Sequence, residues 1–187
     1  EIDEETLSRA YRRQAAALAE GGVDGILCRS FTELDALRIA LEAAKAATNL
    51  PLIGSMVFDS GPDFTETVMH VTVPQAAAAI REAGASMVGC DHAEHPDAAA
   101  DVVGMLRAAC DLPVWVEINA GRAELSEDRR VYPETPKAYG ERLPALAQAG
   151  ATIIGGGRGA TRDHIAAMRQ ARDRFLRRRK GRPSAPQ

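Results

Sequence analysis

The sequence predicts an α/β fold built on a parallel sheet. Five short apolar runs alternate with segments of helical periodicity, and each apolar run is followed by such a segment. This alternation places the strands side by side in parallel, with the helices packed outside them. A doubly wound sheet and a (β/α)₈ barrel both fit the pattern. A complete barrel has eight units in about 250 residues, whereas this chain has 187 residues and five units after a leading helix.

The first elements are a helix over residues 5–20, a strand over 25–28 and a helix from about residue 34. The first helix places apolar side chains at helical spacing on one face. Ser30 and Glu33 have the spacing of a capping box, which predicts that the next helix starts there.

The remaining strands and helices continue this alternation. Proline and asparagine at residues 49–51 end the second helix, and Pro74 suits the first turn of the third. Loops are predicted over residues 59–72 and in the polar segment that contains Pro133 and Pro136. The expected strands are 51–58, 85–90, 112–120 and 151–156, and the expected helices are 74–84, 97–110, 137–149 and 161–179.

Composition excludes several classes of partner. A formal net charge of −3 argues against nucleic-acid binding, and no apolar run approaches the length needed to cross a bilayer. The three cysteines Cys28, Cys90 and Cys110 are odd in number and irregularly spaced, which argues against disulfides and fits a reducing compartment. We therefore expect a cytoplasmic protein without nucleic-acid or membrane partners. Because residue 1 is Glu1 and not methionine, the chain is expected to be processed or part of a longer one.

Several segments in order resemble the homocysteine S-methyltransferase family, whose homocysteine-binding domain is shared by cobalamin-dependent methionine synthase and betaine–homocysteine methyltransferase. Each segment alone is weak evidence for the family, and the order and spacing of all four make the resemblance specific. The segments are YRRQAAALAEGGVDGILCRSFTELD (11–35), PLIGSMVFDSG (51–61), INAG (118–121) with Tyr132 and Pro133 downstream, and IIGGGRGATRDHI (153–165).

The resemblance implies a TIM barrel of which residues 1–179 supply about the last five βα units. Residues 180–187, basic and then rich in proline and serine, are expected to form a disordered tail. Five units would leave two open sheet edges and an uncovered apolar inner face. We therefore expect a partner chain or a missing N-terminal segment to complete the barrel.

The family binds zinc through three cysteine thiolates, and the metal makes the homocysteine thiol nucleophilic toward a methyl donor. The resemblance places these ligands at His92, Gly157 and Arg158, so all three thiolates are replaced. Arg158 puts a permanent cation where a dication would bind. The resemblance thus implies methyl transfer to a thiol such as homocysteine, with the activity altered or lost.

A different metal site is one alternative. Cys90, His92 and His95 form a C-x-H-x-x-H string at the catalytic end of the expected barrel, and each residue type binds zinc. Three such residues also occur together by chance in a plain polar loop, so both interpretations stay open.

The expected substrate-binding residues are Arg29, Ser30, Asn119 and Arg158. Arg29 and Ser30 align with the family's Glu-Thr, and a cation there favours a carboxylate or phosphate over an ammonium group. Arg158 lies among glycines before a helix, as in anion-binding turns, although such a turn is also a common tight turn. Asn119 lines the pocket or only shapes a turn. Two alternatives to the methyltransferase follow: a divergent enzyme with an anionic substrate, and a non-catalytic barrel fragment or partner subunit.

Overall fold

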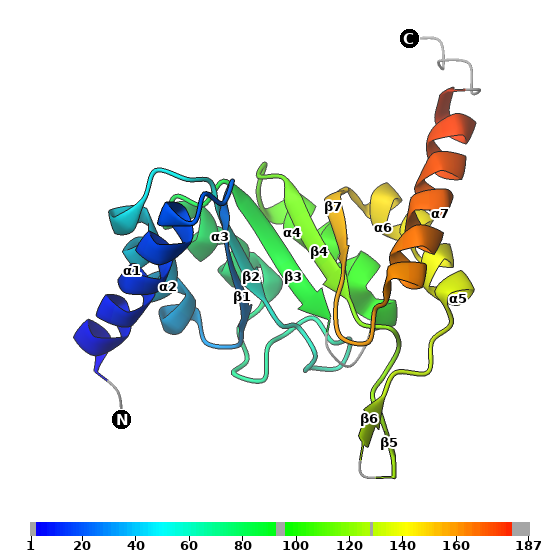
Figure 1. Cartoon of the computed structure of the whole chain (residues 1–187), viewed down its shortest axis with the longest axis horizontal. Helices are drawn as coiled ribbons and strands as arrows, with labels where there is room; N and C mark the ends of the chain where they lie inside the picture. The colour runs from blue at the N-terminus through cyan, green and yellow to red at the C-terminus, as the bar shows by residue number, and fades with distance from the viewer. Residues whose placement is uncertain (1–2, 93–95, 128, 181–187) are drawn as a thin grey trace.

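A five-stranded parallel sheet organises the chain in the computed structural model, which describes residues 3–92, 96–127 and 129–180. Each strand is preceded by a glycine, proline or serine, and the five strands lie side by side in Figure 1. They are β1 (Ile26–Phe31), β2 (Leu52–Met56), β3 (Met87–His92), β4 (Val114–Ile118) and β7 (Ala151–Gly156).

Helices connect and flank these strands. A two-stranded antiparallel hairpin, β5 (Glu124–Ser126) and β6 (Arg129–Val131), lies between β4 and α5. The helices are α1 (Glu4–Glu20), α2 (Leu34–Ala47), α3 (Val73–Glu82), α4 (Ala99–Ala109), α5 (Pro136–Glu141), α6 (Leu143–Ala149) and α7 (Arg162–Lys180), with a short 3₁₀ helix, η1 (Pro96–Ala98), before α4.

The strand order selects between the two α/β architectures. The sheet runs β1-β2-β3-β4-β7, so each strand pairs with the next parallel strand along the chain and the order never reverses. A doubly wound sheet has a switch point at which the order reverses, whereas a barrel wall does not. The architecture is therefore that of a barrel wall, with the connecting helices α3 and α4 behind the sheet in Figure 1.

The hydrophobic core lies between the sheet and these helices. Val88, Val114, Val116 and Ile118 point from β3 and β4 toward the helices and are fully buried. Leu106 of α4 is also fully buried in this core. Because side chains alternate along a strand, the residues between them face the opposite side of the sheet.

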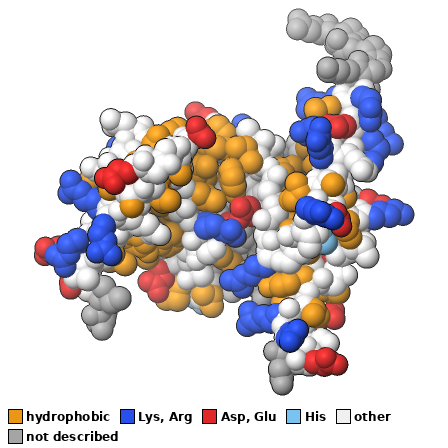
Figure 2. Space-filling view, in the orientation of Figure 1, with side chains coloured by type: hydrophobic (Ala, Val, Ile, Leu, Met, Phe, Trp, Pro, Cys, Tyr) orange, Lys and Arg blue, Asp and Glu red, His pale blue; other side chains and the backbone are white. Residues whose placement is uncertain are grey.

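That opposite side, the concave face, is only partly covered. Near the amino ends of the strands it carries apolar side chains that are half-buried or exposed, and Figure 2 shows hydrophobic side chains gathered over the sheet with charged ones beside them. Ile153 on β7 is 38% exposed. The other apolar residues of this face are Leu27, Ile53, Met87 and Trp115.

The two edges of the sheet are also uncovered within the described residues. β1 pairs only with β2, and β7 pairs only with β4. Next to β7, an apolar groove is lined by Ile153, Ile165, Phe175 and Leu176, with arginines of α7 at its rim. α1 and α7 lie at opposite ends of the sheet in Figure 1, so the wall is not closed on itself. The expected open edges and exposed inner face are present.

Three local expectations were wrong. Ser30 does not cap a helix: it lies in β1 with φ of 65°, and α2 starts at Leu34 after Glu33, which makes no side-chain cap. The helix expected over 137–149 is two helices, α5 and α6, because Pro144 in the first turn of α6 has no N–H to continue the ladder. The polar loop that follows β4 contains the β5–β6 hairpin.

The described residues include no helix long and apolar enough to cross a membrane. Lys180, the first residue of the expected tail, still belongs to α7, and residues 181–187 lie outside the described part of the chain.

Candidate functional site

Two carboxylates face each other on neighbouring strands at the carboxyl edge of the sheet. Asp91 of β3 is the register partner of Glu117 of β4, and both lie on the concave face. Both residues are buried, with 5% and 9% of their surface exposed. Parallel α/β barrels place their binding sites at this end of the strands.

Asp91 is the centre of a hydrogen-bond network drawn from three strands. Ser55 Oγ of β2 donates to Asp91 Oδ1 at 2.7 Å, and Ser30 Oγ of β1 donates to Asp91 Oδ2 at 2.9 Å. Arg29 Nε lies 3.4 Å from the same Oδ2. The left-handed backbone of Ser30 follows a register shift in β1 between Cys28 and Phe31. This irregularity places Arg29 and Ser30 together above the carboxylates.

Arg29 joins the second carboxylate to this network. Its Nη2 lies 2.7 Å from Glu117 Oε2, an ion pair that lacks the alignment of a hydrogen bond. Burial raises the pKa of the Glu117 carboxyl, Arg29 opposes that increase, and the charge of Asp91 adds to it. The Arg29 side chain is 41% exposed, so its guanidinium reaches solvent, whereas the two carboxylates are buried.

The network carries one positive and two negative charges. A site of this kind offers carboxylates to an ammonium group and the accessible side of a guanidinium to a carboxylate. Arg29 was expected to favour anions on its own account, but the structure shows its charge already balanced by Asp91 and Glu117. Preference of Arg29 for an anionic group stays a prediction, and any such group would also lie near the two acidic side chains.

The glycine-rich turn after β7 is tied to the end of β4 by backbone hydrogen bonds. Gly157 N–H donates to the carbonyl of Ile118 at 2.7 Å, and Ala120 N–H donates to the carbonyl of Arg158 at 2.9 Å. Asn119 Oδ1 accepts from Arg158 N–H at 2.8 Å. Asn119 is buried and Arg158 is exposed, so these two predicted substrate residues meet through the backbone of the turn.

The turn's backbone donors are largely used within the protein. Besides Gly157 and Arg158, Ala160 N–H donates to the carbonyl of Gly157 at 3.3 Å, and Thr161 N–H donates to His164 Nδ1 at 3.2 Å. An anion-binding turn needs such N–H groups directed at the ligand. The Arg158 side chain therefore supplies whatever anion recognition this turn provides.

The residues of the turn do not fit the thiolate zinc site that the family resemblance implies. Positions 157 and 158 hold glycine and arginine, and neither has a metal-binding atom. A Cβ atom added at Gly157 would lie 2.5 Å from Asn119 Oδ1 and 3.0 Å from the Ile118 carbonyl oxygen. A side chain at the first of these positions would therefore require Asn119 and the neighbouring backbone to shift.

The alternative metal string lies partly outside the described residues. Cys90 is fully buried in the core on the helix side of β3, and burial strongly raises the pKa of its thiol. His92 ends β3, but its side chain is not described, and His95 lies outside the described residues. Among the residues that are described, no group of three or more His, Cys, Asp or Glu side chains could hold a metal ion. The proposal of metal binding by Cys90, His92 and His95 stays a prediction.

His164 and Tyr139 hold the segments on either side of the glycine-rich turn in place. His164 Nδ1 lies 2.8 Å from Thr161 Oγ1, and its Nε2 lies 2.8 Å from the carbonyl oxygen of Glu134. Tyr139 packs edge-on against the His164 ring and donates its hydroxyl to the Ile118 carbonyl at 2.7 Å. These contacts fix the start of α7 and the end of β4, which position the glycine turn.

Sequence reasoning missed the central role of Asp91 and the contribution of Ser55. A detectable signal existed: both are polar residues inside or directly after apolar runs, on the strand face opposite the core. The register that places them beside Arg29 depends on the sheet and not on sequence spacing.

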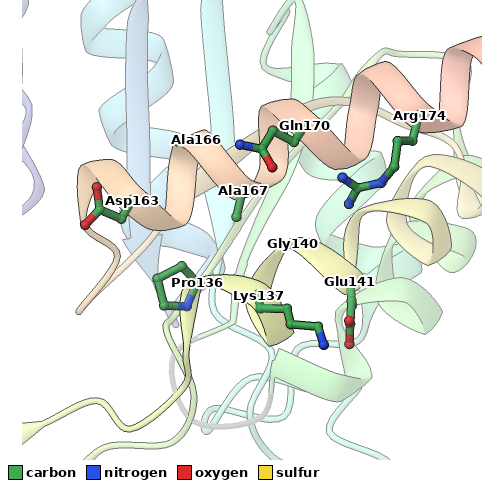
Figure 3. A pocket seen from close by; sticks show the side chains of 9 residues that line it. All are labelled: Pro136, Lys137, Gly140, Glu141, Asp163, Ala166, Ala167, Gln170 and Arg174. Carbon is green, nitrogen blue, oxygen red and sulfur yellow. The ribbon is translucent and has the colours of Figure 1, made fainter.

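A hollow lies on the outside of the molecule, between α5 and α7 (Figure 3). Lys137 and Glu141 extend from α5, and Asp163, Gln170 and Arg174 extend from α7. Its charges are mixed, and none of the residues that line it comes from a strand. The strand ends therefore hold the better candidate site.

Comparison with known proteins identifies the family. Residues 1–172 match the family model described as homocysteine S-methyltransferase. The chain belongs to the homocysteine S-methyltransferase family. It is 27% identical over 163 residues to methionine synthase of Mycobacterium leprae and 26% identical over 163 residues to that of Mycobacterium tuberculosis. These matches cover 83% of this chain but only 13% of the length of either relative.

Solved structures confirm the barrel-type fold of this family member. The Escherichia coli homocysteine methyltransferase MmuM superposes with a TM-score of 0.71 in its apo form and 0.73 in its metallated form, each at 18% identity. The match covers 91% of this chain and 58% or 52% of the MmuM chain. The carboxyl transferase domain of Rhizobium etli pyruvate carboxylase matches with a TM-score of 0.58. This chain thus has the fold of part of a barrel.

Proposed function

We propose that this chain is the ligand-binding part of a homocysteine S-methyltransferase-type barrel, and that it binds a zwitterionic amino acid such as homocysteine. In this proposal, methyl transfer to the thiol is altered or lost because the family's zinc cysteines are replaced at positions 92, 157 and 158. One observation carries the proposal: the Arg29–Asp91–Glu117 network at the carboxyl ends of neighbouring strands.

The charges of the network favour a zwitterion over a simple anion. A phosphate or a dicarboxylate placed against Arg29 would also approach Asp91 and Glu117, and that proximity of like charges is unfavourable. An α-amino acid presents a carboxylate and an ammonium group on one carbon, so it complements both signs. The family membership supports homocysteine as the first ligand to test.

Binding is measurable through Trp115, the only tryptophan of the chain, which lies two residues before Glu117 on the same face. We expect homocysteine to change its fluorescence with saturation, and Arg29→Gln or Asp91→Asn to weaken binding at least tenfold. Arg38→Gln is the matched control, because Arg38 forms its ion pairs on the outside of α2. Calorimetry on the same variants provides a second readout.

Two further ligands distinguish the alternatives. Saturable binding of inorganic phosphate or glutarate, without binding of homocysteine, would support the enzyme with an anionic substrate instead. If none of the three ligands binds, the zwitterion proposal is wrong. A methyl-transfer assay with homocysteine and a sulfonium donor, with and without added zinc, tests the catalytic part. Turnover at a rate typical of a working enzyme would contradict a lost activity.

A second candidate function is that of a barrel partner, which the open edges and the concave apolar face support. In this proposal, three more βα units from outside residues 1–187 pair with β1 and β7 and cover Leu27, Ile53 and Trp115. Co-expression with a polypeptide of three such units should give a one-to-one complex by size-exclusion chromatography. Trp115 emission should shift to shorter wavelength on assembly. A chain that is monomeric, cooperatively folded and indifferent to such units would contradict this function.

A further inference from the structure

The two carboxylates of the Arg29 network differ in how far their hydrogen-bonding capacity is already used. We propose that Glu117 receives the ammonium group of the ligand, whereas Asp91 is a positioning residue that holds Arg29 and Ser30 in place. This assignment rests on the proposed binding of a zwitterionic amino acid, and it names the residue that selects ligands with an amino group.

Asp91 already has hydrogen-bond donors at both of its oxygens. Ser55 Oγ donates to Oδ1 at 2.7 Å, Ser30 Oγ donates to Oδ2 at 2.9 Å, and Arg29 Nε lies 3.4 Å from the same Oδ2. Asp91 is also buried, so little acceptor capacity is left for a ligand. Its contacts join β1, β2 and β3 and keep the guanidinium of Arg29 at the carboxyl edge of the sheet. Asp91 therefore acts on a ligand through Arg29.

Glu117 has the acceptor capacity that Asp91 lacks. Its side chain is 10% exposed, and its Oε2 is a buried atom without a hydrogen-bond partner, although Arg29 Nη2 forms an ion pair with it. A carboxylate accepts hydrogen bonds at about four positions, and a buried oxygen that accepts none is costly. An ammonium group supplies both N–H donors and a positive charge. Its binding at Glu117 is therefore more favourable than its binding at Asp91.

Trp115 is a second polar group beside the Glu117 carboxyl. It lies two residues before Glu117 on the same face of β4, and its Nε1 is also buried without a hydrogen-bond partner. Burial raises the pKa of the Glu117 carboxyl, and the neighbouring indole N–H opposes that increase. A group bound at Glu117 therefore changes the surroundings of the Trp115 ring, whose fluorescence reports on it.

Arg29 retains donors for the carboxylate of the same ligand. Its Nε and Nη2 make the contacts to Asp91 and Glu117, and its side chain reaches solvent. A guanidinium carries several N–H donors in one plane, so the donors of its outer edge can pair with a ligand carboxylate. An α-amino acid then spans Arg29 and Glu117 with its two charged groups. A ligand without the amino group keeps only the contact to Arg29.

Two ligands that differ only in the amino group test the assignment. Homocysteine and 4-sulfanylbutanoate share the carboxylate and the thiol, and only homocysteine carries the ammonium group. We expect calorimetry on the whole chain to give a dissociation constant at least about tenfold lower for homocysteine, because hydrogen bonds between charged groups are strong. Equal affinity of the wild-type protein for the two ligands would overturn the assignment of Glu117.

Substitution of each carboxylate separates the two roles. Glu117→Gln should bring the two dissociation constants within about threefold of each other, whereas Asp91→Asn should weaken both ligands by a similar factor and preserve their ratio. Glu124→Gln is the matched control and should change neither constant, because Glu124 is exposed on the hairpin that follows β4. A ratio that is kept in Glu117→Gln but lost in Asp91→Asn would reverse the assignment.

A more conservative variant covers the case in which Glu117→Gln does not fold. Glu117→Asp keeps the charge beside Arg29 but withdraws the carboxylate by one methylene, so the ratio should still fall at least about threefold. An unchanged ratio in this variant would contradict the assignment. If the wild-type protein does not bind homocysteine, the zwitterion proposal itself is wrong. If homocysteine binds but the ratios differ from those expected, only the assignment of Glu117 is wrong.

Discussion

Arg29 Nη2 and Glu117 Oε2 lie 2.7 Å apart, although they come from strands separated by two others. In a flat sheet, β1 and β4 would be about 14 Å apart, three times the spacing of neighbouring strands. The contact therefore depends on the curvature of the wall, which turns the side chains of its concave face toward one another. This ion pair is a direct product of the barrel-type fold.

Removal of Arg29 should destabilise the protein in a pH-dependent way. Burial raises the pKa of Glu117, so this group contributes most below the ordinary carboxyl range and loses that contribution as the pH rises through its folded pKa. Arg29→Ala removes the opposing cation and raises that pKa further. We expect a deficit in unfolding free energy of about 1–3 kcal/mol at pH 7.5, smaller at pH 4, by urea denaturation. Arg29→Ala/Glu117→Gln should lose most of this pH dependence, and equal deficits at both pH values would contradict the assignment.

Gly159→Ala should destabilise the fold, because position 159 combines a positive φ with close contact to Tyr132. We expect a loss of more than about 1 kcal/mol and a lower melting temperature. Gly104→Ala is the matched control: Gly104 lies within α4, and a Cβ there meets nothing within 4 Å. That substitution should raise stability by up to about 1 kcal/mol. Thermal melts check the prediction: the melting temperature should fall in Gly159→Ala and rise in Gly104→Ala, and shifts of the same sign would contradict it.

The cysteines should differ in reactivity in the folded protein. Burial raises the pKa of half-buried Cys28 to about 11 and that of fully buried Cys90 still higher. A disulfide reagent at pH 8 should label Cys28 slowly and Cys90 only after unfolding. Peptide mapping identifies the labelled thiols. Rapid labelling of Cys90, or its protection by zinc in native protein, would favour the metal site of Cys90, His92 and His95.

Arg142 should be important for the junction between α5 and α6. It donates from Nε to Glu134 at 2.7 Å and also pairs with Asp97. Glu134 is buried, so Arg142→Ala would leave a buried carboxylate without its cation, and we expect a loss of about 1–3 kcal/mol in unfolding free energy. Arg172→Ala is the control, since Arg172 pairs with its exposed neighbour Asp173; this change should cost under about 1 kcal/mol. Similar losses for both variants would argue against a special role of Arg142.

The sequence by itself determined the alternation of strands and helices, the parallel sheet and the family. Hydrophobic periodicity depends on neighbouring residues, and the family depends on four motifs in a fixed order. Both can be recognised in the sequence without knowledge of the tertiary contacts. Pro74 lies in the first turn of α3 as expected, because the proline ring fixes the backbone locally. The sequence also shows Gly157 and Arg158 at the two positions where the family resemblance leads us to expect cysteine.

Only the tertiary structure decided what Ser30, Asp91 and Asn119 do. Ser30 has the local spacing of a helix cap, yet its hydroxyl donates to Asp91, 61 residues away in the chain. Asn119 was equally compatible with a pocket or a turn, and its amide oxygen accepts from the Arg158 N–H between the ends of the neighbouring strands β4 and β7. Such contacts depend on strand register and wall curvature, which arise from the packing of the whole sheet against its helices and have no counterpart in sequence spacing.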